Sequence, residues 1–112
     1  MAIVAIADLY CIRGRRDELV ALLAEAERAA AAQPGCIRYT FAATLSDPDR
    51  FMLVSEWRDR AAMDAHYGSR AFASFQFSLD GLLARPSDMT IYSVTRSERP
   101  VASGPMDPRD AD

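Results

Sequence analysis

The chain has 112 residues, which is enough for one small domain and too few for two. Half of the residues are hydrophobic and 26% are charged, which is the balance of an ordinary soluble globular protein. The formal net charge is −3 and the basic residues are mostly scattered, so the composition argues against a nucleic-acid-binding surface. Arg13, Arg15 and Arg16 form a small basic cluster, which we interpret as a solvated turn before a helix.

The chain carries no pattern of a signal peptide, a membrane span or a metal site. Its first residues, MAIVAIADLY, lack a basic start, and Asp8 interrupts their apolar run. No apolar stretch is long enough to cross a bilayer. Cys11 and Cys36 match no metal-binding spacing, and a single histidine does not complete a site with them. We therefore expect a cytoplasmic protein with free thiols and no bound metal.

The first half of the chain predicts a strand followed by a helix. Residues 2–12 alternate with a period of two. Asp8 among them is either a solvent-facing or paired carboxylate or a polar group that enters a pocket, and we expect the first. Gln33-Pro34-Gly35 ends the helix, because Pro34 disfavours helix in the preceding residue and Gly35 permits a tight turn. The helix itself spans residues 15–33, with a buried stripe made of Leu19, Leu22, Leu23, Ala26 and Ala30.

A hairpin and a last strand follow. Residues 36–46 and residues 51–58 each alternate with a period of two, and the turn Asp47-Pro48-Asp49 joins them closely. So short a connection predicts that the two strands pair antiparallel. Residues 89–96 alternate in the same way and form the last strand.

Between the hairpin and the last strand, two helices carry much of the aromatic content. Asp59 is expected to cap a short helix and Ser69 to cap a longer one, because each side chain can accept a hydrogen bond from a free backbone N–H. If these helices fold back over the third strand, five rings line one cavity: those of Trp57, His66, Tyr67, Phe72 and Phe75.

The element order β-α-β-β-α-β predicts an α+β fold of the ferredoxin-like, split βαβ type, with a four-stranded antiparallel sheet and helices on one face. This domain covers residues 1–97. Residues 98–112 form a Pro-rich tail with few large apolar groups, so we expect it to be flexible. The other face of the sheet keeps apolar side chains, and we expect a second copy of the chain to cover it in a homodimer.

Four motifs occur along the chain: Pro34-Gly35-Cys36-Ile37-Arg38-Tyr39, Asp47-Pro48-Asp49-Arg50-Phe51, Ser55-Glu56-Trp57, and residues 62–69 followed by Phe72. In this order and spacing they resemble the antibiotic biosynthesis monooxygenase domain family, over residues 2–96. The resemblance implies a dimeric α+β barrel. It also implies oxidation of a quinol or a polyketide-type phenol by molecular oxygen, without cofactor. The expected partners are therefore a second copy, a small aromatic or hydrophobic substrate and O₂, with no nucleic acid and no membrane.

The same resemblance suggests the site. Trp57 and His66 match family positions and are the catalytic candidates: Trp57 as a stacking wall, and His66 as a base or as a donor to the developing oxyanion. Each also has a structural interpretation, since a Trp at a strand end often anchors a core and a lone His often bonds a backbone carbonyl. The substrate-binding candidates are Tyr67, Phe72, Phe75, Arg38, Tyr39 and Glu56.

Two other functions remain open from the sequence. One is a non-catalytic dimeric module that holds a small hydrophobic ligand, and the other is an isomerase on the same scaffold. Haem degradation, which one branch of the family performs, is not favoured. Gln76 stands where that branch has its axial histidine, and it is a poor ligand for iron.

Overall fold

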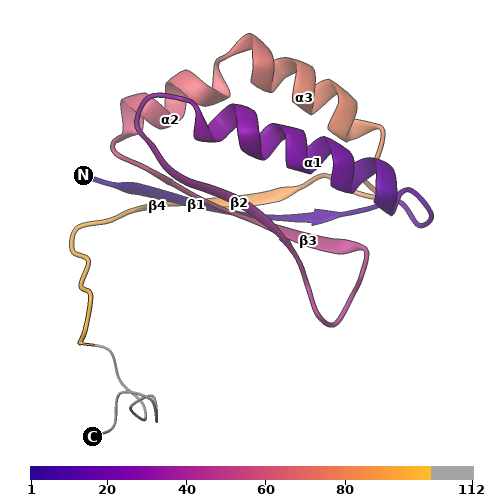
Figure 1. Cartoon of the computed structure of the whole chain (residues 1–112), viewed down its shortest axis with the longest axis horizontal. Coiled ribbons are helices and arrows are strands. Elements are labelled where there is room, and N and C mark those ends of the chain that lie inside the picture. The colour runs from indigo at the N-terminus through magenta and orange to yellow at the C-terminus, as the bar shows by residue number, and fades with distance from the viewer. Residues whose placement is uncertain (102–112) are drawn as a thin grey trace, which may run out of the picture.

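The computed structural model of the chain describes residues 1–101, and its elements follow the predicted order (Figure 1). They are β1 (Ile3–Tyr10), α1 (Arg16–Ala31), β2 (Cys36–Ala43), β3 (Arg50–Trp57), α2 (Arg60–Tyr67), α3 (Arg70–Asp80) and β4 (Asp88–Ser93). The α+β, ferredoxin-like fold is therefore confirmed, with α2 and α3 in place of the second helix. Of the tail expected over residues 98–112, the part from residue 102 onward lies outside the described residues.

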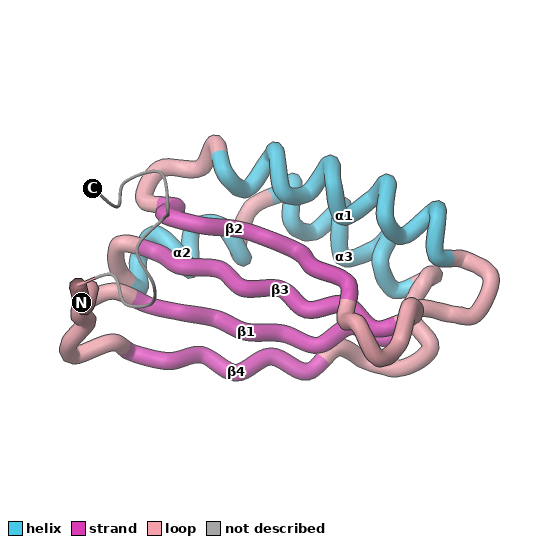
Figure 2. Tube along the Cα trace, turned by 60° about the horizontal axis from the view of Figure 1, so that its bottom comes forward, coloured by secondary structure: helices cyan, strands magenta, loops and turns pink. Residues whose placement is uncertain are grey.

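The strands form one antiparallel sheet in the order β2-β3-β1-β4, so β2 and β4 are its edges (Figure 2). Ala7 of β1 lies opposite both Leu53 of β3 and Met89 of β4. Because successive side chains point to opposite faces, the odd-numbered residues of β1, β3 and β4, and those of β2 from Tyr39 onward, share the face that the helices cover. That face holds most of the buried core, including Ile3, Ala5, Leu9, Phe51 and Trp57.

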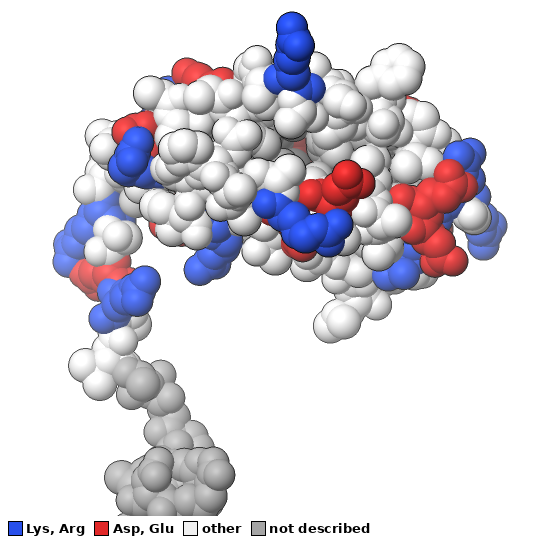
Figure 3. All heavy atoms as spheres, turned by 45° about the horizontal axis from the view of Figure 1, so that its top comes forward, with Lys and Arg blue, Asp and Glu red and all other residues white. Residues whose placement is uncertain are grey.

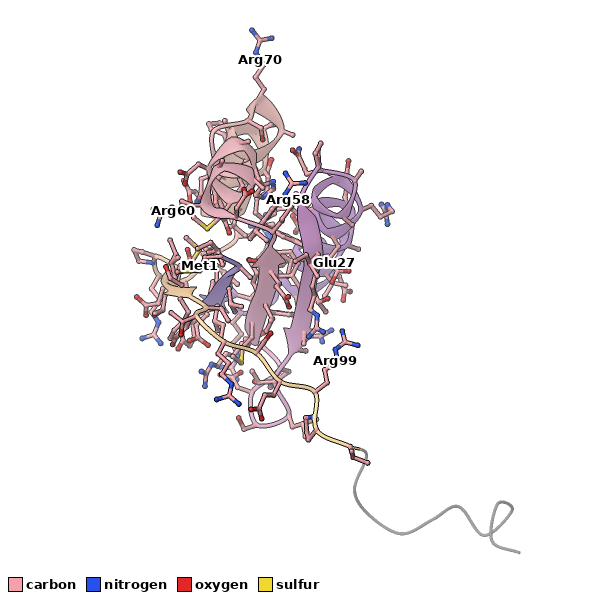
Figure 4. All side chains as sticks on the ribbon, turned by 90° about the vertical axis from the view of Figure 1, so that its left-hand side faces the viewer. Met1, Glu27, Arg58, Arg60, Arg70 and Arg99 are labelled. Atoms are coloured by element: carbon pink, nitrogen blue, oxygen red, sulfur yellow. The ribbon has the colours of Figure 1, made fainter. Side chains whose placement is uncertain are left out.

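The three helices form a second layer on this face. Figure 4 shows the layers from the side, with Arg70 at the start of α3 pointing away from the sheet. α1 packs along β2, and α3 packs against α1. Both predicted caps are confirmed: Asp59 accepts a hydrogen bond from the Ala62 N–H at 2.8 Å, and Ser69 accepts one from the Phe72 N–H at 3.1 Å.

No helix within residues 1–101 covers the even-numbered face of the sheet, which Figure 2 presents to the viewer. Its apolar members, Val4, Ile6, Met52 and Val54, are half-buried. Asp8 lies on the same face and accepts a hydrogen bond from the Arg50 guanidinium at 2.8 Å. Asp8 is therefore a paired carboxylate, as one of the two interpretations of the sequence expected.

The strands β1, β2 and β4 are shorter than the sequence pattern suggests. β2 ends at Ala43; the next residue, Thr44, donates its N–H to the Arg50 carbonyl at 3.0 Å and its hydroxyl to the Asp47 carbonyl in the turn at 2.8 Å. Cys11 is buried and Cys36 half-buried, both thiols are free, and burial raises the pKa of each. In residues 1–101, no helix has the length and hydropathy to cross a membrane, and His, Cys, Asp and Glu side chains gather nowhere as a possible metal site.

Gly35 allows the loop between α1 and β2 to pack closely against the start of α2. Its φ of +82° lies in the left-handed region, and a Cβ at this position would meet the Ala62 Cβ at 2.6 Å. Its carbonyl accepts a hydrogen bond from the Arg58 N–H at 2.8 Å. The Pro-Gly motif is thus a close contact between two segments that are far apart in the sequence.

Replacement of the two left-handed glycines by alanine separates the backbone effect from the contact. Gly14 has a φ of +87°, and a methyl group added there would meet no neighbour within 4 Å, so Gly14→Ala should cost only the strain of about 1–2 kcal/mol. Gly35→Ala adds a collision with Ala62 and should cost more. Urea unfolding of both variants measures the difference, and equal losses of stability would contradict the contact.

Candidate functional site

An apolar cavity of about 310 Å³ lies between the sheet and the helices α2 and α3, and we call it the chamber. The central strands supply its floor through Ala7, Leu9 and Leu53. Helix α3 supplies most of the opposite side, where the side chains recur at helical spacing: Phe72, Phe75, Gln76 and Leu79. A chamber of this size is at the lower end of the range for small-molecule sites.

The chamber exists because a small residue stands where the helices do not reach the sheet. Ala7 is central in the sheet, and its methyl group fills little of the space above it. α3 packs against α1, and this keeps it over the gap instead of closing it. The space-filling view of the helical side shows wide uncharged areas, with acidic and basic groups in several clusters, one of them near the middle of the face (Figure 3).

Two phenol groups bring polarity to the chamber wall. Tyr39 reaches it from β2 and Tyr67 from the end of α2. Burial raises the pKa of Tyr39 well above its ordinary value of 10, and it also raises the pKa of Tyr67, an effect that the neighbouring Ser55 hydroxyl partly offsets. Both phenols are therefore protonated at neutral pH. They can donate hydrogen bonds to an oxygen atom of a ligand.

The mouth of the chamber lies toward the edge strand β4. Ser87 and Met89 line it there, and Met89 is 44% exposed. The Tyr67 hydroxyl donates to the Met89 sulfur at 3.5 Å, which is a weak acceptor that a ligand oxygen can replace. The Gln76 amide, also at the wall, donates to Asp80 at 2.7 Å.

Trp57 and His66 lie behind the chamber wall, not in it. Their rings stack with centroids 5.0 Å apart, and the interplanar angle is 28°. The rings of Tyr39, Tyr67 and Phe72 surround His66 edge-on at 5.2, 4.9 and 5.3 Å. Trp57 is fully buried and His66 is 5% exposed. The single-cavity prediction was thus wrong for these two rings, because the phenols and Phe72 stand between them and the chamber.

His66 is an uncharged group in this cluster. Neither of its ring nitrogens, nor the Trp57 indole nitrogen, has a hydrogen-bond partner in the described part of the chain. Burial lowers the pKa of His66 below its ordinary 6.5. A neutral imidazole packed against an indole and two phenols fixes where those phenols stand.

The comparisons with known proteins agree with this architecture. The sequence model of the family described as antibiotic biosynthesis monooxygenase matches residues 2–77, which is more than half of the chain. The chain belongs to the antibiotic biosynthesis monooxygenase family. The match ends within α3, so Ser87 and Met89 at the chamber mouth lie beyond it.

The sequence identities to three individual relatives lie between 24% and 30%. The uncharacterized protein sll1783 of Synechocystis sp. is 30% identical over 84 residues, which cover 75% of this chain and 57% of that protein. The chain thus spans less than two thirds of the length of this relative. Rv0793 of Mycobacterium tuberculosis has a TM-score of 0.81 at 24% identity, over 88% of this chain and 100% of that one. SO0527 of Shewanella oneidensis has a TM-score of 0.75 at 27% identity, over 81% of this chain and 88% of that one.

The predicted substrate-binding residues lie on two different faces of the sheet. Tyr39, Tyr67, Phe72 and Phe75 line the chamber. Arg38 and Glu56 are register partners on β2 and β3, but both are even-numbered and point to the face without helices. The structure therefore does not bring these two side chains to the chamber.

The sequence did not single out several residues that line the chamber. Gln76 shares the helical face of Phe72 and Phe75, so its spacing could have indicated it. Met89 has the strand parity of the chamber side, but nothing in its sequence indicates that it faces empty space. Ala7 contributes by being small, which only its central place in the sheet reveals.

The buried imidazole predicts a pH dependence of stability. The lowered pKa means that the unfolded chain takes up a proton at His66 before the folded protein does. The contribution of the neutral His66 to the free energy of unfolding is therefore complete above about pH 6.5. It is lost as the pH falls from there through the lowered pKa. His66→Phe, which keeps an aromatic ring, should remove this dependence. Urea unfolding of both proteins between about pH 7.5 and pH 5 measures it, and parallel curves would contradict the assignment.

Proposed function

We propose that the chain is a monooxygenase that oxidises a quinol or a polyketide-type phenol with molecular oxygen and without a cofactor. The proposal rests on the chamber, which is apolar and lined by aromatic rings. The protonated hydroxyl groups of Tyr39 and Tyr67 lie at its wall. Apolar surfaces suit a flat aromatic ligand, and they exclude the water that would compete for its anion. Membership of the family supports the same reaction class.

The proposed reaction needs little from the protein except binding and charge stabilisation. A phenol such as an anthrone enol loses its proton to water at the mouth, and the resulting anion passes an electron to O₂. Joining of the two radicals forms a C–O bond and, after protonation, a hydroperoxide. Loss of the carbon-bound proton then breaks the O–O bond and releases water. One oxygen atom remains as a new carbonyl, so that CH₂ plus O₂ gives C=O plus H₂O.

In this proposal the hydroxyl groups of Tyr39 and Tyr67 stabilise the substrate anion, and the buried rings behind them hold the two tyrosines in place. The Tyr67 hydroxyl would leave the Met89 sulfur and donate to the substrate oxyanion, with Tyr39 as a second donor. Trp57 and His66 are positioning residues, because their rings support the two tyrosines from behind. Phe72 and Phe75 would hold the flat face of the substrate.

One observation favours a second candidate, a non-catalytic module that binds a small hydrophobic ligand. In the described part of the chain, the chamber is lined by no Asp, Glu or His side chain that could act as a base. A binding module needs no such group. An isomerase that moves protons on the same scaffold would need one, which makes it the weaker alternative.

Oxygen consumption tests the proposed function against the binding module. With an anthrone or menadiol, and with the spontaneous rate subtracted, the protein should speed O₂ uptake, and the anthrone should gain one oxygen atom as a carbonyl group. Ala7→Leu fills the chamber floor and should reduce the rate roughly tenfold or more, while Ala21→Leu on the exposed side of α1 should not. Ligand binding without any enzymic uptake would favour the binding module.

We also propose that the uncovered sheet face joins two copies in a homodimer. The half-buried Ile6 lies near the centre of that face, opposite Val54 and Thr90. Ile6→Arg should therefore lower the mass seen by light scattering from dimer to monomer at micromolar concentration. Phe77 is 85% exposed on α3, on the other side of the molecule, and Phe77→Arg should leave the mass unchanged. A monomeric unmodified protein would refute the dimer.

A further inference from the structure

A second, much smaller pocket of about 30 Å³ lies behind the chamber, and we call it the rear pocket. Alanine methyl groups make up much of its lining: Ala26, Ala29 and Ala30 from α1 and Ala71 from α3. The rings of Tyr39, His66, Phe72 and Phe75 complete it, together with Gln33. A volume of this size holds one molecule about as large as water.

The rear pocket stands between the chamber and the outside. A surface groove of about 360 Å³ runs between α1 and α3, and it shares Ala26, Ala29, Ala71 and Phe75 with the rear pocket. The rear pocket in turn shares Tyr39, Phe72 and Phe75 with the chamber. Phe75 therefore borders all three spaces, and it separates the groove from the chamber. This route is distinct from the mouth at Ser87 and Met89.

The lining of the rear pocket suits an apolar molecule better than water. A buried water typically makes about three hydrogen bonds, whereas methyl groups and ring carbons offer none. His66 lines the pocket, but its two nitrogens are packed so closely that a molecule of the size of water cannot reach them. Gln33 is the one polar side chain in the lining other than these rings. Apolar cavities stay dry, and an apolar cavity of about 150 Å³ takes up xenon.

We propose that the rear pocket is a binding site for dioxygen, which reaches the chamber from the α1–α3 groove past Phe75. This inference rests on the proposed function and adds to it a place for the second substrate. A flat phenol that fills the chamber would block the mouth against O₂. A separate path lets an apolar diatomic gas arrive from behind, through the ring wall, while bulk water stays excluded.

Closing the path at Ala26 tests the proposal. Ala26 borders both the groove and the rear pocket, so Ala26→Leu should fill the passage. Ala24 is the matched control, because it lies on α1 as well but borders a different hollow beside Val20 and Phe41. Under xenon pressure, crystals of the unmodified protein and of Ala24→Leu should show xenon in the rear pocket, and crystals of Ala26→Leu should not.

The second readout is kinetic. With a saturating phenol, Ala26→Leu should raise the KM for O₂ by roughly fivefold to tenfold, while the KM for the phenol and the Ala24→Leu values stay unchanged. Thermal unfolding shows whether Ala26→Leu folds; if it does not, Ala26→Val adds less volume and takes its place.

Three results would overturn the proposal. They are an ordered water bound in the rear pocket of the unmodified protein, the absence of xenon there, and an unchanged KM for O₂ in a folded variant that has lost the xenon. Absence of turnover with every phenol would overturn the proposed function, and with it the role of the pocket in a reaction. The xenon experiment separates the two failures, because it reports on the pocket without any turnover.

Discussion

The stack of Trp57 against His66 is the contact on which the rest of the site depends. Trp57 ends β3 and His66 lies in the last turn of α2, so their contact holds that helix against the sheet. Tyr67 follows His66 directly, and the Ser69 cap then turns the chain into α3. The stack thus holds the end of α2 from which the chain continues into α3, although neither ring lines the chamber.

This stack combines strong packing with unfavourable polarity. Indole and imidazole bury large ring surfaces, and aromatic pairs contribute about 0.5–1.5 kcal/mol beyond their area. Three nitrogens without partners within residues 1–101 oppose this, at about 1–3 kcal/mol for each group left unsatisfied. A phenylalanine at position 66 would avoid two of these penalties. The imidazole therefore positions the two phenols at an energetic cost that a phenylalanine would not carry.

The sequence predicts the fold well because the fold depends on periodicity and caps. Alternation locates all four strands, and Asp59 and Ser69 locate the starts of α2 and α3. The same parity also predicts that Arg38 and Glu56 turn away from Tyr39 and Trp57, a signal that the motif resemblance obscured. What the sequence could not show is the height of α3 above the sheet. That height decides whether Phe72 and Phe75 fill a core or border a cavity, and it depends on packing against α1.

The position of β4 affects how a ligand would enter and leave the chamber. β4 is an edge strand, paired to the sheet on one side through β1, and the chamber mouth lies beside it. Edge elements fray at lower free energy than central ones, since fewer hydrogen bonds and contacts are lost. The Asp88 end of β4 can therefore open locally while β1 and β3 stay paired. A ligand of the proposed kind would then need only local opening at the rim, while the hydrophobic centre of the molecule keeps its packing.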